Sequence, residues 1–330
     1  MSEILSYKYG STGFVEIYEK KVIKNMDMED MYWLKEYSNL LYLWFLDHDN
    51  IASFYNIEYI ENNYPNTNNK SNFFSLTYPN YGKPLSEVEI KNDNSILQIL
   101  VDLLSAISTC HEHKIWHRDI KKDNIIITEN MRAVLIDFTH SVRIRTENIK
   151  LEKEISTYSH RAPEVFLYLE DRVKKYDEKI DIWSLGVILF EIVTNKNMYL
   201  EITKNGTERE LCNFFLDNKT YINDIKKIYN KSIHNIFKNK KQKLYWSLIE
   251  RMLLFEPKDR PDASILLDEI LKFAHDNTIE LEFYPCITNS NIKKIDKYFS
   301  DQIIKLTEDI DNKLTEDIDN KLTEDIDNKL

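Results

Sequence analysis

Cysteine is scarce in this sequence of 330 residues. The three cysteines, Cys110, Cys212 and Cys286, lie far apart and form no CxxC pair. An odd number of distant cysteines predicts neither a disulfide framework nor a cysteine zinc site. The sequence therefore favours a reducing, intracellular compartment such as the cytoplasm.

Long apolar runs and an excess of positive charge are also missing. The segment Met1–Gly10 has no apolar core of a signal peptide, and runs such as Leu40–Leu46 fall short of the roughly 20 residues that span a bilayer. The chain carries 44 basic and 55 acidic residues, which gives a formal net charge of -11. Because nucleic acid and anionic membranes attract a positive surface, we expect neither of them as a partner.

The pattern of apolar residues predicts two lobes, since the chain exceeds the roughly 250 to 300 residues at which a single core stops growing. Residues 7–24 alternate between apolar and polar as short strands do, and residues 28–46 have the spacing of one helix. Further helical spacing predicts helices over residues 96–111, 176–193, 244–255 and 263–273. We therefore predict an α+β protein with a small β-rich lobe and one main helix over residues 1–79, and a larger α-helical lobe over residues 80–275.

Residues 276–330 are predicted to form a C-terminal extension. From Leu306 the octad LTEDIDNK occurs three times, so residues 306–330 carry -6 of the net charge of -11. Apolar residues recur here at every fourth position, which makes the apolar stripe wind around a helix. A coiled coil needs an average spacing near 3.5. We expect a solvated acidic tail, and a helix that binds a partner is the alternative.

The segment Ile115–Ile127 reads IWHRDIKKDNIII and carries the strongest motif. It resembles the HRDxKxxN catalytic loop of eukaryotic-type protein kinases, of the Ser/Thr kind because Lys121 stands at the place of that group's lysine. The resemblance implies that Asp119 accepts the proton of a substrate hydroxyl and that Lys121 stabilises charge on the transferred phosphoryl group. It also implies that Asn124 gives an oxygen to Mg²⁺. The alternative is an ordinary polar loop between a helix and a strand.

A second motif follows the strand-like run Ala133–Ile136. Asp137, Phe138 and Thr139 resemble the DFG motif of the same family, with threonine in place of glycine. The resemblance implies that Asp137 is a second Mg²⁺ ligand, beside Asn124. Because a β-branched residue resists backbone angles that glycine permits, we expect this loop to switch less freely between alternative states.

Two further motifs resemble structural parts of the family. Glu164 in HRAPE and Arg260 in EPKDRP imply a buried ion pair, and Asp181 in DIWSLG implies a carboxylate that holds backbone amides of the catalytic loop. Three histidines lie close together in the sequence: His111, His113 and His117. They could bind zinc, but no carboxylate or thiol completes a plausible ligand set. We therefore interpret them as structural residues.

The N-terminal region carries weaker motifs. Gly10, Gly13 and Val15 resemble the second half of the GxGxxGxV loop that approaches phosphates, with Lys8 where the first glycine is usual. An ordinary hairpin turn is the alternative. Lys24 resembles the strand lysine that binds the α- and β-phosphates of ATP.

The acidic partner of that lysine is predicted to be Glu36, because Leu40 lies one turn later on the same helix face. Glu29 is the rival, and a solvated Glu36 is the alternative. Thr77, Tyr78 and Pro79 lie where the family binds adenine through backbone groups, so we count Thr77 and Tyr78 as nucleotide-binding positions.

Arg118 precedes the predicted base, and in kinases with this arginine an anion from the activation loop usually orders the segment. We expect the anion to be the carboxylate of Glu152 or Glu154, or a phosphate on one of four hydroxyl residues. These four are Thr146, Ser156, Thr157 and Tyr158. Our hypothesis is that Glu152 or Glu154 partly substitutes for phosphate. Thr157 is alternatively a residue that packs the loop.

The resemblance implies a bilobal protein kinase fold, use of ATP and Mg²⁺, and protein substrates. Abundant Asn, Ile, Lys and Tyr and a short N-terminal lobe resemble kinases of large DNA viruses, which would place the protein in the host cytoplasm. One alternative is a pseudokinase or nucleotide-binding scaffold, if Lys24 or the Gly10 loop fails to hold nucleotide. Another is a small-molecule kinase of the aminoglycoside type, which shares the catalytic Asp and Asn but lacks the RAPE segment.

Overall fold

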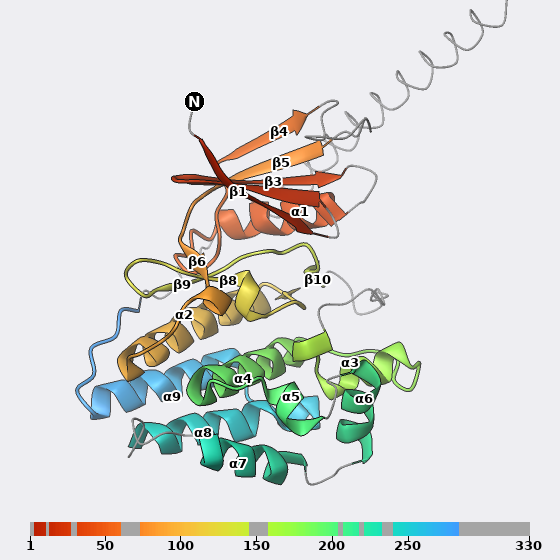
Figure 1. Cartoon of the computed structure of the whole chain (residues 1–330), viewed down its shortest axis with the longest axis vertical. Helices are drawn as coiled ribbons and strands as arrows, with labels where there is room; N and C mark the ends of the chain where they lie inside the picture. Colours follow the sequence, from red (N-terminus) through yellow and green to blue (C-terminus); the bar gives the residue numbers. More distant parts are fainter. Residues whose placement is uncertain are drawn as a thin grey trace, which may run out of the picture. The chain divides into compact units, whose positions relative to one another are not determined.

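A computed structural model describes residues 3–10, 13–27, 32–60, 73–144, 158–203, 207–217, 221–232 and 240–283 of the chain. The chain folds into a β-sheet lobe and a helical lobe, joined by short strands (Figure 1). Within the described residues, no helix combines the length and the apolar character needed to cross a membrane.

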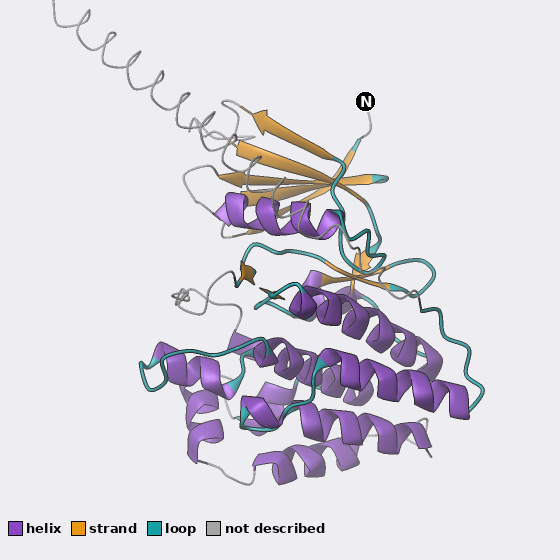
Figure 2. Ribbon diagram, turned by 180° about the vertical axis from the view of Figure 1, so that it is seen from behind, coloured by secondary structure: helices purple, strands orange, loops and turns teal. Residues whose placement is uncertain are grey.

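The N-terminal lobe is an antiparallel sheet of five strands in the order β1-β2-β3-β5-β4. The strands are β1 (Ile4–Gly10), β2 (Gly13–Tyr18), β3 (Lys21–Asp27), β4 (Asn56–Ile60) and β5 (Phe73–Pro79). Helix α1 (Tyr32–Trp44) lies against this sheet (Figure 2). The ring of Trp33 lies 4.4 Å from the ring of Phe74, so an aromatic contact fixes α1 to β5.

The C-terminal lobe is mainly helical, and its core is built around two helices. Helix α2 (Asp93–Glu112) and helix α4 (Lys179–Thr194) bury nearly every side chain between their first and last turns. A helix that is apolar on all sides is stable only when other elements surround it. The surrounding helices are α3 (Pro163–Leu169), α5 (Met198–Ile202), α6 (Glu208–Asp217), α7 (Tyr221–Ser232), α8 (Lys240–Met252) and α9 (Ala263–Asp276).

Two small sheets lie between the lobes and hold the loops that carry the predicted site. One contains β6 (Lys83–Pro84), β8 (Ile125–Ile127) and β9 (Ala133–Leu135), and the other pairs β7 (Ile115–Trp116) with β10 (Val142–Arg143). Single-turn helices complete the connections: η1 (Leu85–Glu87), η2 (Lys122–Asn124), η3 (Tyr158–His160) and η5 (Pro257–Asp259). The loop from β7 to β8 and the turn after β9 therefore start from fixed strand ends.

The α+β bilobal architecture predicted from the sequence is confirmed. The helix predicted over residues 176–193 begins at Lys179, because Glu178 is its N-cap. The helix predicted over residues 244–255 begins at Lys240 and ends at Met252. The predicted lobe limits stay a prediction, and the acidic repeats lie outside the described residues.

Candidate active site

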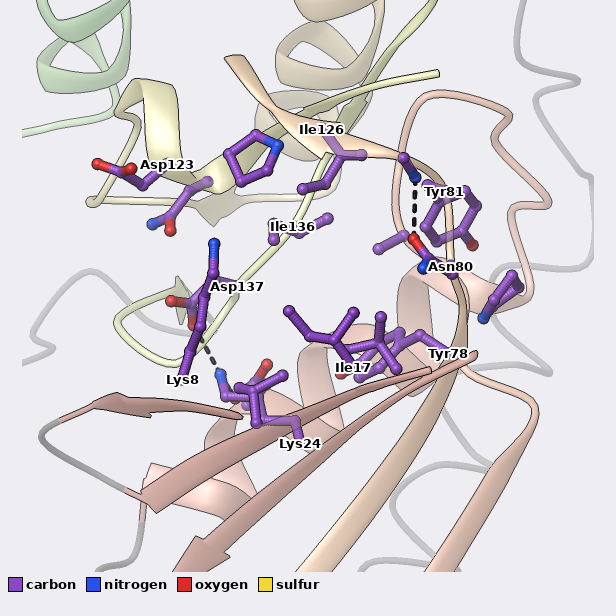
Figure 3. A pocket seen from close by; sticks show the side chains of 18 residues that line it. Lys8, Ile17, Lys24, Tyr78, Asn80, Tyr81, Asp123, Ile126, Ile136 and Asp137 are labelled. Carbon is purple, nitrogen blue, oxygen red and sulfur yellow. Dashed lines mark hydrogen bonds and ion pairs between the residues drawn. The ribbon is translucent and has the colours of Figure 1, made fainter. Parts of the chain in front are cut away.

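A cavity of about 250 Å³ lies between the N-terminal sheet and the small sheets (Figure 3). Its apolar walls come from both lobes: Val15, Ile17 and Val22 on one side, and Ile126 and Ile136 on the other. A slot with apolar walls and a few polar groups is the usual form of a small-molecule site. Lys24, Glu36, Tyr78, Asn124 and Asp137 line it as well, so together with Val15 six predicted site residues meet there.

Lys24 is the centre of the charged end of the cavity. Its Nζ lies 2.7 Å from Glu36 Oε2, 2.7 Å from Asp137 Oδ1 and 2.7 Å from the hydroxyl of Thr139. An ammonium group has three donors, and these three oxygens account for all of them. Figure 3 shows the Lys24–Asp137 ion pair across the cavity.

The hydroxyl of Thr139 links the two carboxylates. Its Oγ1 lies 2.7 Å from Glu36 Oε2 and 2.6 Å from Asp137 Oδ1. A hydroxyl has one proton, so it donates to one carboxylate at a time while it accepts from Lys24. The threonine that replaces the glycine of the DFG motif is therefore tied to helix α1 by a side chain that glycine lacks.

The pKa values in this cluster separate the two carboxylates. Burial raises the pKa of Glu36, although Lys24 opposes this. Burial would also raise the pKa of Asp137, but the positive charge and hydrogen bond of Lys24, with the hydrogen bond of Thr139, hold it well below its usual range. Burial disfavours the charged form of Lys24, yet Asp137 and Glu36 raise its pKa above the ordinary value. Asp137 is thus the carboxylate that stays ionised, and 31% of its side chain is exposed.

The loop between β7 and β8 holds Asp119 in a fixed position. Asp119 is 4% exposed, and its Oδ2 accepts hydrogen bonds from Lys121 Nζ at 2.7 Å and from Asn124 Nδ2 at 3.0 Å. The same amide of Asn124 also donates to the backbone oxygen of Asp119 at 2.9 Å. Because Nδ2 makes both contacts, Oδ1 of Asn124 is left to accept from other groups.

Two residues of this region have strained backbones, and Asp181 holds one of them, Arg118. Arg118 and Asp137 have φ angles of 69° and 65°, which non-glycine residues adopt rarely and mostly at functional sites. Asp181 accepts hydrogen bonds from the backbone N–H of His117 at 2.9 Å and of Arg118 at 2.8 Å. The carboxylate is 1% exposed, so these contacts are shielded from water.

The histidines near the loop have structural partners. His111 Nε2 lies 3.0 Å from Asp181, and His113 Nδ1 lies 3.0 Å from the hydroxyl of Tyr42. His117 Nδ1 accepts from the N–H of Asp119, so its proton is on Nε2, which donates to the oxygen of Ile136.

Of the three residues predicted to hold adenine, Tyr78 and Pro79 line the cavity and Thr77 does not. Thr77 is 6% exposed and pairs with Ile23, whereas Tyr78 pairs with the cavity residue Val22. Successive residues of a strand face opposite sides of the sheet, so Thr77 faces away from the cavity. The ring of Tyr78 lines the cavity, and burial, with the nearby carboxylates of Glu36 and Asp137, raises the pKa of its hydroxyl well above the ordinary value. The chain that borders the cavity is residues 79–82.

Gly82 belongs to that border. It has a φ of 141°, and an added Cβ would lie 2.3 Å from the oxygen of Ile127, so only glycine fits there. Its N–H donates to Asn80 Oδ1 at 3.2 Å.

The two predicted phosphate-loop glycines close the β1–β2 hairpin, where Gly10 pairs with Gly13. Gly13 does not line the cavity, whereas Val15 does. An added Cβ on Gly13 would lie 1.9 Å from the oxygen of Asn25, so this glycine is required by the approach of β2 to β3. Lys8 lines the cavity and pairs with Glu87 of η1 at 3.0 Å.

The predicted Glu164–Arg260 pair is present and buried. Arg260 binds both carboxylate oxygens of Glu164, at 2.6 Å and 2.8 Å. Its remaining N–H groups donate to the backbone oxygens of Leu254, Lys179 and Phe255, so all five donors are used. The pair links the start of α3 to the segment before α9.

Magnesium fits the cavity through Asn124 and Asp137, which offer an amide oxygen and an ionised carboxylate. Mg²⁺ in phosphate-binding sites is usually held by one or two such oxygens, with phosphate and water as the other ligands. Across the part of the chain that the structure describes, no cluster of three or more His, Cys, Asp or Glu is placed to bind a metal.

Sequence reasoning missed several residues of the cavity wall. Asp123 had a signal, since it lies within the HRDxKxxN segment next to Asn124, and Lys8 had one at the place of a glycine. The other missed residues gave no signal, because in a single sequence an apolar or turn residue that lines a cavity cannot be told from one that packs elsewhere. These residues are Ile17, Val22, Ala52, Asn80, Tyr81, Gly82, Pro84, Ile126 and Ile136.

The two lobes and this arrangement of residues define the class of the protein, the protein kinase-like fold. The model of the protein kinase domain family matches residues 11–271, so the chain belongs to that family. It is 33% identical over 132 residues to the Citron Rho-interacting kinase of Mus musculus, covering 39% of this chain and 6% of that protein. It is 31% identical over 199 residues to the mitogen-activated protein kinase hog1 of Trichoderma harzianum, covering 56% of this chain and 54% of that protein.

The sperm motility kinase Z of Mus musculus is 34% identical over 128 residues, which cover 38% of this chain and 24% of that protein. The chain thus spans about half or less of the length of these three relatives. None of the comparisons bears on the viral source, which stays a prediction.

Proposed function

We propose that the chain is a Ser/Thr protein kinase that transfers the γ-phosphate of ATP to hydroxyl groups of proteins. The observation that carries the proposal is the meeting of Asn124, Asp137 and the Lys24–Glu36 pair on one cavity, with Asp119 hydrogen-bonded to Asn124. Family membership and relatives named as protein kinases support the coarser function, protein phosphorylation. Lys121 and the family's motif support the Ser/Thr assignment.

The proposed roles follow from the positions of the side chains. Asp119 orients the substrate hydroxyl and accepts its proton, because it is a carboxylate held in place by two donors. Lys121, 2.7 Å from Asp119, stabilises negative charge on the transferred group. Asn124 and Asp137 hold Mg²⁺, which when bound neutralises charge on the phosphate oxygens.

Lys24 binds the α- and β-phosphates in this proposal. Its three donors already have partners, so a phosphate has to replace one of them. Asp137 is the partner that can leave, since Mg²⁺ then compensates its charge, while Glu36 continues to orient the ammonium. The backbone of residues 79–82 and the ring of Tyr78 hold the adenine, with Val15 above it. Gly10 and Gly13 shape the hairpin that covers the phosphates.

Substitution of Asp119 by asparagine tests the proposal. Asp119→Asn keeps an acceptor for Lys121 and Asn124 but removes the base, so we expect turnover to fall by about 10² to 10⁴-fold. The dissociation constant of Mg-ATP should change little, because Asp119 contacts the hydroxyl side. Calorimetric titration with Mg-ATP and radiolabel transfer to a general protein substrate measure the two quantities.

The outcomes also separate the rival functions. Binding of Mg-ATP by the unmodified chain without transfer of label would indicate a pseudokinase or scaffold. Transfer to small alcohols but not to protein would indicate a small-molecule kinase. Equal losses of ATP binding and turnover in Asp119→Asn would contradict the role of Asp119.

A further inference from the structure

One face of helix α1 meets the chain that follows Asp137. Glu36, Asn39 and Tyr42 are spaced three residues apart, so they share a face of the helix. Opposite them lie Thr139, Ser141 and Arg143. Each member of one set contacts one member of the other, and the Glu36–Thr139 contact described above is the first of the three.

The second contact joins Asn39 to Ser141. Asn39 Nδ2 donates to Ser141 Oγ at 2.8 Å, and the Ser141 hydroxyl donates its own proton to the backbone oxygen of Phe138. Asn39 is 5% exposed and Ser141 is 2% exposed. Removal of either group leaves a buried polar partner unsatisfied, which makes this contact costly to break.

The third contact joins Tyr42 to Arg143. The guanidinium carbon of Arg143 lies 3.6 Å from the ring centroid of Tyr42, within the range of a cation–π interaction. The hydroxyl of Tyr42 also binds His113, the C-cap of α2. Arg143 belongs to β10, which pairs with β7, and the N–H of Ile144 donates to Lys114 at 2.8 Å. The helix is thereby connected to the C-terminal lobe.

Two aromatic residues of α1 contact the sheet. Trp33 and Tyr37 pack against Phe74, with ring centroids 4.4 Å and 5.7 Å apart. Apolar contacts therefore hold α1 to the N-terminal sheet, and three polar contacts set its rotation relative to residues 139–143. A rotation that took Glu36 away from Lys24 would break the Asn39 and Tyr42 contacts as well.

We propose that Asn39 and Tyr42 are positioning residues, which with Ser141 and Arg143 hold α1 where Glu36 meets Lys24. The inference rests on the proposed function, since it assigns the control of the Lys24–Glu36 pair to contacts within the chain. Asn39 and Tyr42 touch no part of the cavity and act through Glu36. Their loss lets α1 turn, and Lys24 is then no longer oriented toward the phosphates.

The test is a double-mutant cycle of Asn39→Ala and Ser141→Ala, with Ser141→Thr as the variant that keeps the hydroxyl. We expect each alanine variant to lower kcat about ten-fold, as for one buried hydrogen bond, and the double variant to be no worse than either. Ser141→Thr should retain most of the activity. Amide hydrogen exchange in residues 32–44 should be faster in both alanine variants.

The control variant is Thr194→Val, which removes a buried hydroxyl that donates to Phe190 within α4. It should leave both kcat and exchange in α1 unchanged. If the alanine variants fail to fold, Arg143→Gln at a half-buried position replaces them, and it should likewise lower kcat and speed exchange in α1. The inference is overturned if these substitutions change kcat and α1 exchange no more than Thr194→Val does. A chain without transferase activity would disprove the proposed function, and hydrogen exchange would still decide the inference.

Discussion

Thr139 makes contacts that the glycine of the family's DFG motif could not make. Its hydroxyl accepts a hydrogen bond from Lys24 and lies within 2.7 Å of carboxylate oxygens of Glu36 and Asp137. A glycine has no side chain to make these contacts. The backbone strain falls two positions earlier, on Asp137, where φ is 65°. From the β-branched side chain alone, the sequence analysis predicted that this loop switches less freely between alternative states. The structure adds a second reason, because movement of the loop breaks hydrogen bonds to α1.

Lys8 is the residue whose effect on nucleotide binding is easiest to isolate. Its ammonium lines the cavity and pairs with Glu87 at 3.0 Å, with 52% and 53% of the two side chains exposed. Glu87→Gln frees the ammonium to attract phosphates, so we expect ATP to bind a few-fold more tightly. Lys8→Ala should weaken ATP binding. Both effects should shrink at high salt, because exposed charges are screened.

Adenosine is the control ligand, since it has the base and sugar of ATP but no phosphates. Its dissociation constant, measured by the same titration, should be equal in the unmodified chain and in both variants. Parallel shifts for ATP and adenosine would show that the Lys8–Glu87 pair alters the shape of the cavity and not the charge near the phosphates.

Residues within family motifs could be predicted from the sequence, and residues outside them could not. Asp119, Asn124 and Asp137 were predicted because their segments resemble the catalytic-loop and DFG motifs of protein kinases. Thr77 was predicted beside Tyr78 but does not line the cavity, because successive residues of a strand face opposite sides and the sequence does not show which side faces the cavity. Gly13 was recognised as special, but the structure explains it by contact with β3.

At the scale of elements, the site depends on strands of two or three residues. The pairs β7–β10 and β8–β9 fix both ends of the catalytic loop and the start of the turn that carries Asp137. Such strands are too short for a two-residue period to appear, so of these four strands the sequence analysis indicated only β9, as the strand-like run Ala133–Ile136. The long helices α2, α4 and α9 were predicted because their apolar periodicity extends over several turns.

The link between α3 and the segment before α9 depends on Arg260, which uses all five donors. Arg260→Lys cannot reach these acceptors, so we expect the free energy of unfolding to fall by about 3 to 5 kcal/mol. Urea denaturation measures the change. Arg251→Lys is the matched control, since its pair with Glu269 is 35% exposed on each side, and its effect should stay below about 1 kcal/mol. Equal effects of the two substitutions would contradict the structural role of Arg260.

At the scale of the whole molecule, stability should fall in mild acid because a buried histidine resists protonation. Burial, with the nearby positive charge of Lys122, lowers the pKa of His160 to about 4. An unfolded histidine has a pKa of about 6.5, so between these values the unfolded chain binds the additional proton. Acidification through this range therefore destabilises the fold by about 3 kcal/mol at most, and the effect levels off below the folded pKa.

His160→Asn isolates this contribution, because asparagine keeps a polar group beside Ser159 but does not titrate. The pKa values of His48 and His140 are also lowered, mainly by burial, and both variants share those effects. As the pH falls from 6.5 to 4, the free energy of unfolding of the unmodified chain should fall relative to that of His160→Asn. Parallel curves would show that His160 has the same pKa in the folded and the unfolded chain.

The most direct test of the central claim is the Mg²⁺ dependence of label transfer from γ-labelled ATP, compared between the unmodified chain and Asp137→Asn. We expect Mg²⁺-dependent phosphoserine and phosphothreonine in the protein substrate. In Asp137→Asn, the Mg²⁺ concentration for half-maximal transfer should rise and the maximal rate should fall. Transfer with an unchanged Mg²⁺ requirement in Asp137→Asn would show that the metal and the nucleotide are held elsewhere.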